Sequence, residues 1–252
     1  LRQLKTNPGF ASVVVLTLAL GMGANTAVFS TVNGVLLRPL PFPEPQELVR
    51  AYSLFLPESG YEGDRIPLSP REVIEYRRST RALERISFYT QVPLTLTGDG
   101  GDPERLSAVA VDAELFPLLG VPPESGRWFN AEEMVPGHLP AAVLSYDLWT
   151  ARFGSDPGIV GSSITLDGSS VEVVGVMPQG FSFPQSEEDI YLTFQHDPDH
   201  VGGWGNHSVS MVGRLAPGVT FDQAQDELAG FVEEWREEYG HPQVGHSIYL
   251  MP

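Results

Sequence analysis

The sequence predicts an α+β protein in which an apolar N-terminal helix precedes a two-lobed domain. Two observations lead to this class. Phe10 to Leu37 contains no charged residue, whereas all 32 Asp and Glu residues follow it and bring the net charge to −17. The rest of the chain alternates between runs with the period-2 spacing of half-buried strands and segments that begin with helix-capping residues.

The apolar run predicts a transmembrane helix over residues 10–37. About 20 apolar residues cross the hydrocarbon core, and a helix satisfies its own backbone hydrogen bonds there. Arg2 and Lys5 are the only charged residues from the first residue to Leu37, where the run ends. Basic residues that flank a membrane helix stay on the cytoplasmic side. We therefore expect residues 1–9 to be a cytoplasmic juxtamembrane segment and the acidic remainder to be extracytoplasmic.

A cleaved secretory signal is the alternative interpretation. Lys5 precedes the run, and Gly23, Ala24 and Ala27 resemble a cleavage region. The apolar character continues past Ala27, however, which is longer than the usual core of a signal. Both interpretations export the rest of the chain, and the absence of cysteine is compatible with export.

The predicted span also carries residues suited to packing against another helix. Small side chains let helices approach closely, and Asn side chains can donate hydrogen bonds across the interface. The candidate helix-packing residues are Gly21, Gly23, Ala24, Asn25, Ala27 and Asn33.

The start of the outer part predicts strand, helix and strand. Glu47 to Leu54 is the first strand. Ser69 then caps a helix that reaches Thr80, and Glu72 completes a capping box. An alternating strand follows, in which Pro93 indicates an edge position; its apolar or half-buried positions are Phe88, Thr90, Val92, Leu94 and Leu96.

The middle predicts shorter elements. Asp167-Gly168 is the turn of a hairpin that extends from Ile164 to Val176. The other expected elements are, in order, a turn at Asp99 to Asp102, a strand from Arg105 to Val111, a helix capped by Asp112 that ends at Gly120, a strand from Ala141 to Leu144, a helix from Ser145 to Phe153, and a strand from Ile190 to Phe194.

The end repeats the pattern of the beginning. Ser208 to Leu215 alternates as a strand, and Thr220 with Gln223 forms a capping box for a helix that reaches Tyr239. His246 to Met251 is the closing strand. The two βαβ units at the ends predict one α/β sandwich with a split sheet, into which the middle is inserted. The expected buried stripe of the last helix is Phe221, Ala224, Leu228, Phe231, Val232 and Trp235.

The composition excludes several classes of function. Lys5 is the only lysine, so the chain has no phosphate-binding Gly-Lys-Ser/Thr loop. The negative charge disfavours nucleic acid as a partner. No catalytic motif is found, and we expect a non-catalytic chain without cofactor or metal. A cluster of His196, Asp197, Asp199, His200 and His207 has the side chains of a metal site, but its spacing matches no standard one and favours a solvated loop.

Two segments carry a resemblance to a known family. Asn7 to Phe10 followed by LTLALGMGANTAVFSTVNGVLLRPLPFPEP (Leu16 to Pro45) resembles the first membrane helix of MacB-type ABC transporter permeases, especially the duplicated orphan permeases called ADOP. ITLDGSSVEVVGVMPQGFSFP (Ile164 to Pro184) is similar to the signature hairpin of the MacB-like periplasmic core domain. The segments occur in the family's order.

The resemblance implies an architecture. Such permeases place a periplasmic domain between their first two membrane helices, with a porter-like lobe and a lobe called Sabre. Residues 46–103 and 201–252 match the porter-like lobe, and residues 104–200 match the Sabre-like lobe. The family has further membrane helices, so we expect this chain to be part of a longer subunit in the bacterial inner membrane.

The resemblance also implies a function. In this family the permease transmits the motion of a separate cytoplasmic ABC ATPase to the periplasmic domain, which exports or handles a substrate. The implied partners are that ATPase, a second permease half or subunit, and in some members a periplasmic adaptor. Two alternatives are a membrane-anchored binding or adaptor module without transport activity, and an anchored hydrolase.

Overall fold

The computed structural model divides the chain into two units, residues 1–41 and 42–252. Each unit is described by itself. The structure describes residues 8–32, 42–57, 60, 63–98, 101–184, 188–197, 202–239 and 246–252.

The first unit contains helix α2 (Pro8–Val32). Its described apolar side chains are mostly exposed, for example Leu18 and Leu20. The hydroxyls of Thr17 and Thr26 donate to the carbonyls of Val13 and Met22, one turn earlier, at 2.8 Å. Among the described residues, no helix combines the length and the apolar composition of a membrane span. The predicted span extends to Leu37, beyond the described residues, and it stays a prediction.

The second unit is a mixed α+β domain around one sheet, as the sequence predicts. The strands lie in the order β11-β1-β10-β3-β4-β9-β6-β8-β5, and β2 and β7 pair at its sides. The strands are β1 (Leu48–Phe55), β2 (Gly63–Ile66), β3 (Leu83–Thr97), β4 (Glu104–Val111), β5 (Ser125–Gly126), β6 (Ala141–Leu144), β7 (Ser163–Leu166), β8 (Ser169–Val176), β9 (Ile190–Thr193), β10 (Ser210–Leu215) and β11 (His246–Met251).

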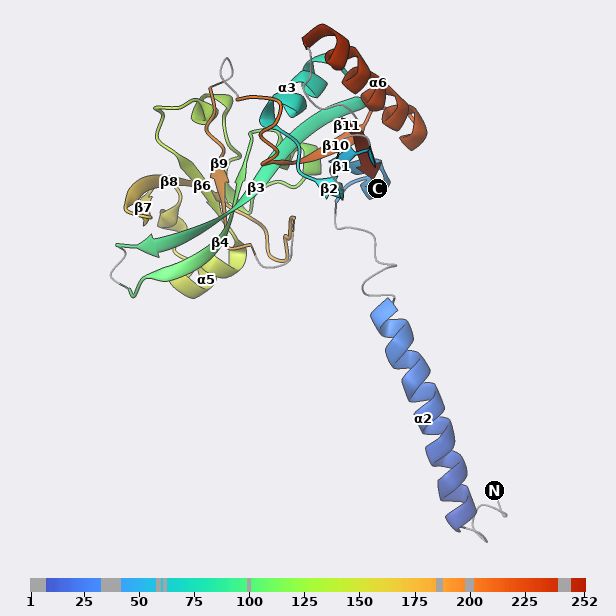
Figure 1. The fold of residues 1–252 in the computed structure, drawn as a ribbon. Helices are drawn as coiled ribbons and strands as arrows, with labels where there is room; N and C mark the ends of the chain where they lie inside the picture. The colour runs from blue at the N-terminus through green and yellow to red at the C-terminus, as the bar shows by residue number, and fades with distance from the viewer. Residues whose placement is uncertain are drawn as a thin grey trace. The chain divides into compact units, whose positions relative to one another are not determined.

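The first half of the sheet contains the predicted split βαβ pair. We define this half as β11, β1, β10 and the start of β3; every neighbouring pair in it is antiparallel. β10 separates β1 from β3, and β1 separates β10 from β11. The strands of the first βαβ motif (β1, β3) therefore alternate with those of the last one (β10, β11). Their helices are α3 (Pro70–Ser79) and α6 (Phe221–Tyr239), which lie near each other over this half in Figure 1.

Both predicted capping boxes are present. Ser69 Oγ accepts from the Glu72 N–H, while Glu72 Oε2 accepts from the Ser69 N–H at 2.7 Å. Thr220 and Gln223 make the equivalent pair at the start of α6. The predicted stripe of α6 is buried at Ala224, Leu228, Val232 and Trp235 and half-buried at Phe221 and Phe231. It packs on α3, where the Tyr76 and Trp235 ring centroids are 4.7 Å apart.

The second half of the sheet consists of β4, β9, β6, β8 and β5. The β4–β9 and β6–β8 pairs are parallel, and β6–β9 is antiparallel. The predicted hairpin of β7 and β8 is present, and Asp167 (φ 47°) and Gly168 (φ 80°) form its turn. The short helices α4 (Leu115–Leu119) and α5 (Tyr146–Phe153) accompany this half.

Strand β3 joins the two halves. Its first part pairs with β10 from Leu83 to Tyr89, and its second part pairs with β4 from Tyr89 to Leu96. The predicted strand from Phe88 to Leu96 is therefore only the second part of a 15-residue strand. The earlier residues Leu83 to Ser87 were missed because Glu84 and Arg85 face solvent.

Pro93 lies where β3 has one partner among the described strands. Gln91 to Leu94 pair with β4, while β10 ends before this stretch and β7 begins after it. Proline cannot donate to a ladder, so the unpaired side suits it. The edge position predicted from Pro93 agrees with this pairing.

Two smaller expectations need correction. Helix α4 begins at Leu115, and its N-cap residue is Glu114, which makes no side-chain cap hydrogen bond. Asp112 lies two residues earlier and is buried; its Oδ1 accepts from Ser87 Oγ and, at 3.2 Å, from the Glu114 N–H just before the helix. Strand β9 ends at Thr193, one residue earlier than expected. Strands β2 and β5 were not predicted, because neither has an alternating apolar pattern. Asp99 and Gly100 of the predicted turn lie outside the described residues.

Glu227 of α6 holds the chain between α3 and β3. Its Oε1 accepts from Thr80 Oγ1 at 2.8 Å, from Arg81 N at 2.7 Å and from Ala82 N at 3.3 Å. Partial burial alone would raise the pKa of Glu227, but these hydrogen bonds and the nearby Arg81 charge outweigh it, so the pKa is lowered.

We predict that Glu227→Gln destabilises the domain in a pH-dependent way. The folded-state pKa lies below the unfolded value, so the stabilisation is fully present above the unfolded pKa and is lost as the pH falls through the folded pKa. Urea unfolding should show a loss of about 1 kcal/mol at neutral pH and a smaller loss near about pH 3, below the unfolded pKa.

Glu234→Gln is the matched control, because Glu234 lies exposed on the same helix. It should change the free energy of unfolding by less than about 0.5 kcal/mol at either pH. A loss in Glu227→Gln that is equal at both pH values would contradict the assignment to the charged carboxylate.

Candidate functional site

The second unit begins with a segment that is firmly attached to the sheet. We call residues 42–47 the incoming segment, since they follow the predicted span and lead into β1. The buried Phe42 ring contacts the rings of Phe181 and Phe183 edge-on, with centroids 6.2 and 6.3 Å apart. A 3₁₀ turn, η2 (Pro45–Glu47), then connects to β1.

Arg214 of β10 binds this segment. Its guanidinium donates to the carbonyl oxygens of Pro43 at 3.1 Å and Glu44 at 3.3 Å. It also lies 3.4 Å from Glu47 Oε2. The side chain is buried, and a planar guanidinium with five donors can serve several acceptors at once.

The same guanidinium reaches helix α4. Leu118 O accepts from Arg214 Nε at 3.1 Å and from Nη2 at 2.9 Å. Carbonyls in the last turn of a helix lack an intrahelical partner, and Arg214 supplies one. We call this set of contacts the Arg214 anchor. It joins the incoming segment, the first half of the sheet and α4 beside the second half.

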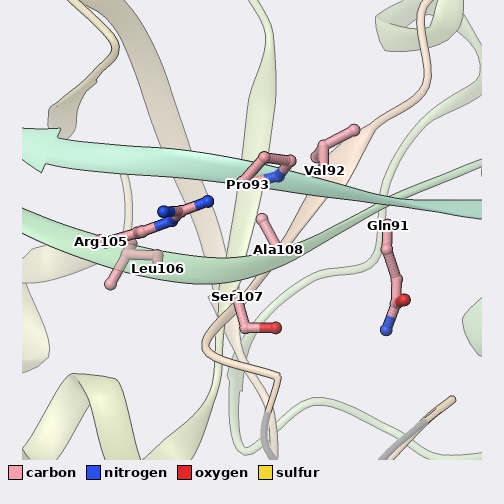
Figure 2. Close-up of a pocket in the computed structure, with 7 residues that line it drawn as sticks. All are labelled: Gln91, Val92, Pro93, Arg105, Leu106, Ser107 and Ala108. Atoms are coloured by element: carbon pink, nitrogen blue, oxygen red, sulfur yellow. The ribbon is translucent and has the colours of Figure 1, made fainter.

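A groove crosses the outside of β3 and β4 near Pro93, where β4 is the one described partner of β3. It has a volume of about 450 Å³ and is lined by Gln91, Val92, Pro93, Arg105, Leu106, Ser107 and Ala108. Figure 2 shows the Gln91 and Ser107 side chains extending to the same side of the two strands.

Glu188 organises the polar side of this groove. Its Oε2 accepts from Ser107 Oγ at 2.7 Å, and its Oε1 accepts from Gln91 Nε2 at 3.0 Å. The next residue, Asp189, accepts from the Ser107 N–H at 2.8 Å. Glu188 is itself buried. The groove therefore offers an amide, a hydroxyl and the Arg105 guanidinium to a polar partner.

A smaller cavity of about 210 Å³ lies beside Arg77, Asp112 and His196. Arg77 and Asp112 form an ion pair. Burial raises the pKa of Asp112, and the Arg77 charge and the Ser87 hydrogen bond oppose that shift only in part. The His196 ring packs against the rings of Phe88 and Phe194, so this residue belongs to an aromatic cluster.

The predicted helix-packing residues are only partly described. Gly21, Gly23, Ala24 and Asn25 are exposed on α2, and the space around both glycines is open. The Ala27 side chain, Asn33, and the basic flank of Arg2 and Lys5 lie outside the described residues. Helix packing and orientation therefore stay predictions.

The His and Asp residues that cluster in the sequence between positions 196 and 207 are only partly described. Asp199 and His200 lie outside the described residues, and His196 and His207 contact different rings. In the described part of the chain, the one group of three possible ligands combines His207 with Glu72 and His246. Sequence reasoning missed this group because its members come from three distant segments.

Arg214 was also missed. It is one of 15 basic residues, and the carbonyls that it binds lie about 96 and 170 positions away in the chain. The one local signal was a charged residue at a buried position of an otherwise apolar strand pattern.

Comparison with known proteins gives one family. The sequence profile of the MacB-like periplasmic core domain matches residues 11–231. No curated protein sequence matches.

Three solved structures share this fold at low sequence identity. A domain assigned to a permease protein of Porphyromonas gingivalis has a TM-score of 0.61 at 15% identity, covering 84% of this chain and 92% of that one. The extracellular domain of the noncanonical ABC-type transporter YknZ from Gram-positive bacteria has a TM-score of 0.58 at 12% identity, covering 81% and 100%. The periplasmic region of MacB from Actinobacillus actinomycetemcomitans has a TM-score of 0.58 at 13% identity, covering 81% and 88%.

We predict that Arg214→Met destabilises the second unit by about 3 kcal/mol, because the carbonyl of the buried Leu118 and the carbonyl of Pro43 lose their donor. Arg85→Met is the matched control: Arg85 lies opposite Arg214 in the β3–β10 register, but its ion pair with Glu114 is exposed. It should cost less than about 1 kcal/mol. Urea unfolding measures both, and equal effects would contradict the anchor.

Proposed function

The chain belongs to the family of MacB-like periplasmic core domains, and from this we propose that it is part of a permease subunit that couples a cytoplasmic ATPase to work outside the membrane. Motion driven by ATP in a separate ATPase would pass through the membrane helices to the sheet of the second unit. That domain would then move or handle a substrate for export. The chain itself is the non-catalytic, force-transmitting part.

The Arg214 anchor is the observation that carries this proposal. A domain that receives motion from a membrane helix needs a stiff connection at the point where the chain arrives. Residues 43–47 are bound through their backbone and a carboxylate to a buried side chain of a central strand. A displacement of the incoming segment would therefore move β10 and α4 rather than unravel a loop.

The proposal includes the membrane part predicted from the sequence. Residues 10–37 would cross the inner membrane with Arg2 and Lys5 on the cytoplasmic side. Gly21, Gly23 and Asn25 would pack against other helices of the permease. The partners would be the ATPase and a second permease half or subunit; an adaptor in the periplasm is compatible with the groove on β3 and β4.

The alternative is a membrane-anchored binding or adaptor module without transport activity. The groove on β3 and β4 supports this alternative, because the buried Glu188 already orients the Gln91 and Ser107 side chains that line it. The two functions differ in one respect. Coupling requires the distance or orientation between the two halves of the sheet to change during ATP turnover, whereas a static module needs no such change.

Distance measurements during turnover test the proposal. The absence of cysteine allows spin labels to be placed at Asp226→Cys on α6 and Ser170→Cys on β8, both exposed. In the permease reconstituted in nanodiscs with its copurifying ATPase, we expect the label distance to differ between ATP with vanadate and ADP.

Arg214→Met should keep ATP hydrolysis but reduce that distance change, since the incoming segment would move without the sheet. The Arg85→Met control should behave as the parent. Identical distance distributions in both nucleotide states, with active ATPase present, would favour the static module.

Single-cysteine labelling tests the predicted membrane topology of residues 10–37. In intact inverted and right-side-out vesicles, Gln3→Cys should react with a membrane-impermeant maleimide only from the cytoplasmic side, and Ser170→Cys only from the opposite side. Leu18→Cys should react from neither, because the bilayer core excludes the reagent. Labelling of Gln3→Cys and Ser170→Cys from the same side would contradict the predicted orientation.

A further inference from the structure

Three side chains from distant segments meet at one end of the first half of the sheet. Glu72 comes from the first turn of α3, His207 from the loop before β10, and His246 from the first residue of β11. A carboxylate oxygen of Glu72 and one ring nitrogen of each histidine lie within 4.8 Å of one another. We propose that Glu72, His207 and His246 bind a divalent transition-metal ion, Zn²⁺ in the first place.

The donor set fits that ion. Two imidazoles and one carboxylate, with a water completing the tetrahedron, are a common zinc environment. Two ligand atoms of one tetrahedral zinc ion lie about 3.4 Å apart, given bond lengths of about 2.0–2.1 Å. His246 Nε2 and Glu72 Oε1 are 3.4 Å apart. The His207 ring lies beside the same carboxylate, with Nδ1 3.9 Å from Glu72 Oε2; binding through Nε2 would require this ring to turn toward the ion.

Hydrogen bonds from Ser69 fix the orientation of the Glu72 carboxylate. The Ser69 N–H and hydroxyl donate to Glu72 Oε2 at 2.7 and 2.9 Å, which leaves Oε1 directed at His246. Glu72 is 1% exposed. Among the described residues no Arg or Lys pairs with this carboxylate, and the basic side chains that lie within 4 Å of it are the two histidines. A cation between them would offset the cost of burying the negative charge.

His207 makes the outer hydrogen bond that is usual for a metal-bound histidine. Such a histidine gives its second ring nitrogen to a backbone carbonyl or a carboxylate. The Pro67 carbonyl oxygen lies 2.8 Å from His207 Nδ1 and accepts its proton, so Nε2 would be the ligand atom. The Phe55 ring packs against both imidazoles, with centroids 5.4 and 5.2 Å away, and limits access of solvent.

The backbone also positions His207. Leu68 and Val209 form an isolated bridge in which the Leu68 N–H donates to Val209 O at 2.7 Å and the Val209 N–H donates back at 3.0 Å. This bridge holds the loop before β10 beside the N-terminus of α3. A metal ion here would connect α3 of the first βαβ unit with β11 of the second.

A hydrolytic role for the same residues is disfavoured by their geometry. Ser53 Oγ lies 3.3 Å from His207 Nδ1, and the Glu72 carboxylate approaches that same nitrogen. A catalytic triad needs the hydroxyl and the carboxylate on opposite ring nitrogens. Ser53 is also buried and donates to Pro67 O at 3.1 Å.

Zinc titration of the purified, tag-free 252-residue chain in detergent tests the proposal. After treatment with a chelator, calorimetry should show one Zn²⁺ bound per chain, and Co²⁺ should give the visible absorption of a tetrahedral site. Glu72→Gln and His246→Gln should each weaken Zn²⁺ binding by at least about 100-fold. Glutamine at position 72 preserves the capping box.

His138→Gln is the matched control, because His138 is exposed and outside the group; it should bind Zn²⁺ within about 3-fold of the parent. A second measurement keeps the test decisive if a variant does not fold. At about 100-fold excess over the dissociation constant, Zn²⁺ should raise the Tm of the parent chain by about 5–10 °C, and Mg²⁺ should not.

Two results would overturn the site. One is a parent chain whose Tm and calorimetric signal do not respond to Zn²⁺, which would leave the group as a proton-sharing ion pair. The other is Zn²⁺ binding that is equal in the parent and in Glu72→Gln and His246→Gln. Neither measurement depends on transport or on an ATPase, so failure here leaves the proposed function unaffected.

Discussion

The continuity of strand β3 is the constraint on which the second unit depends. One strand supplies the partner of β10 on one side of Tyr89 and the partner of β4 on the other. The interlocked βαβ pair and the inserted strands therefore share a single hydrogen-bonded sheet. Three hydrophobic clusters pack against this sheet: one around Tyr76 and Trp235 under α3 and α6, one around Phe116 that also includes Leu48 of β1 and Val212 of β10, and one around Leu144. Strand β3 contributes residues to all three.

Local signals predicted most of the elements. The capping boxes at Ser69 and Thr220 and the Asp167-Gly168 turn act over a few residues, so the sequence displays them directly. The pairing of two βαβ units into one split sheet followed from their patterns, whereas the strand order is given by the structure. The first part of β3 was hidden by its exposed charges. The Arg214 anchor and the Glu72, His207 and His246 group were not predictable, because each depends on which distant segments the sheet brings together.

Buried charge serves two different purposes in this domain. Arg214 is buried beside the backbone carbonyls of Leu118 and Pro43, so its charge is compensated mainly by these dipoles and the half-buried Glu47. Glu72 is buried where the nearest charged or chargeable groups are imidazoles. The first arrangement is permanent, since an arginine stays protonated. The charge balance around Glu72 depends instead on what lies beside the carboxylate, which is why this site suits a bound cation.

Relative motion of the two halves of the sheet is restricted to few places. β3 connects them from Tyr89 onward, and the bond from Arg214 to Leu118 O ties β10 to α4. Between β10 and β7, Gln91 to Leu94 pair with β4 alone among the described strands, so this stretch can twist at the lowest cost in hydrogen bonds. The Arg214 anchor holds the incoming segment to β10, which lies in the first half of the sheet. Under the proposed function, a push on the incoming segment would therefore move the first half of the sheet together with α4, and the change would appear as a twist of β3 at Pro93, where the groove lies.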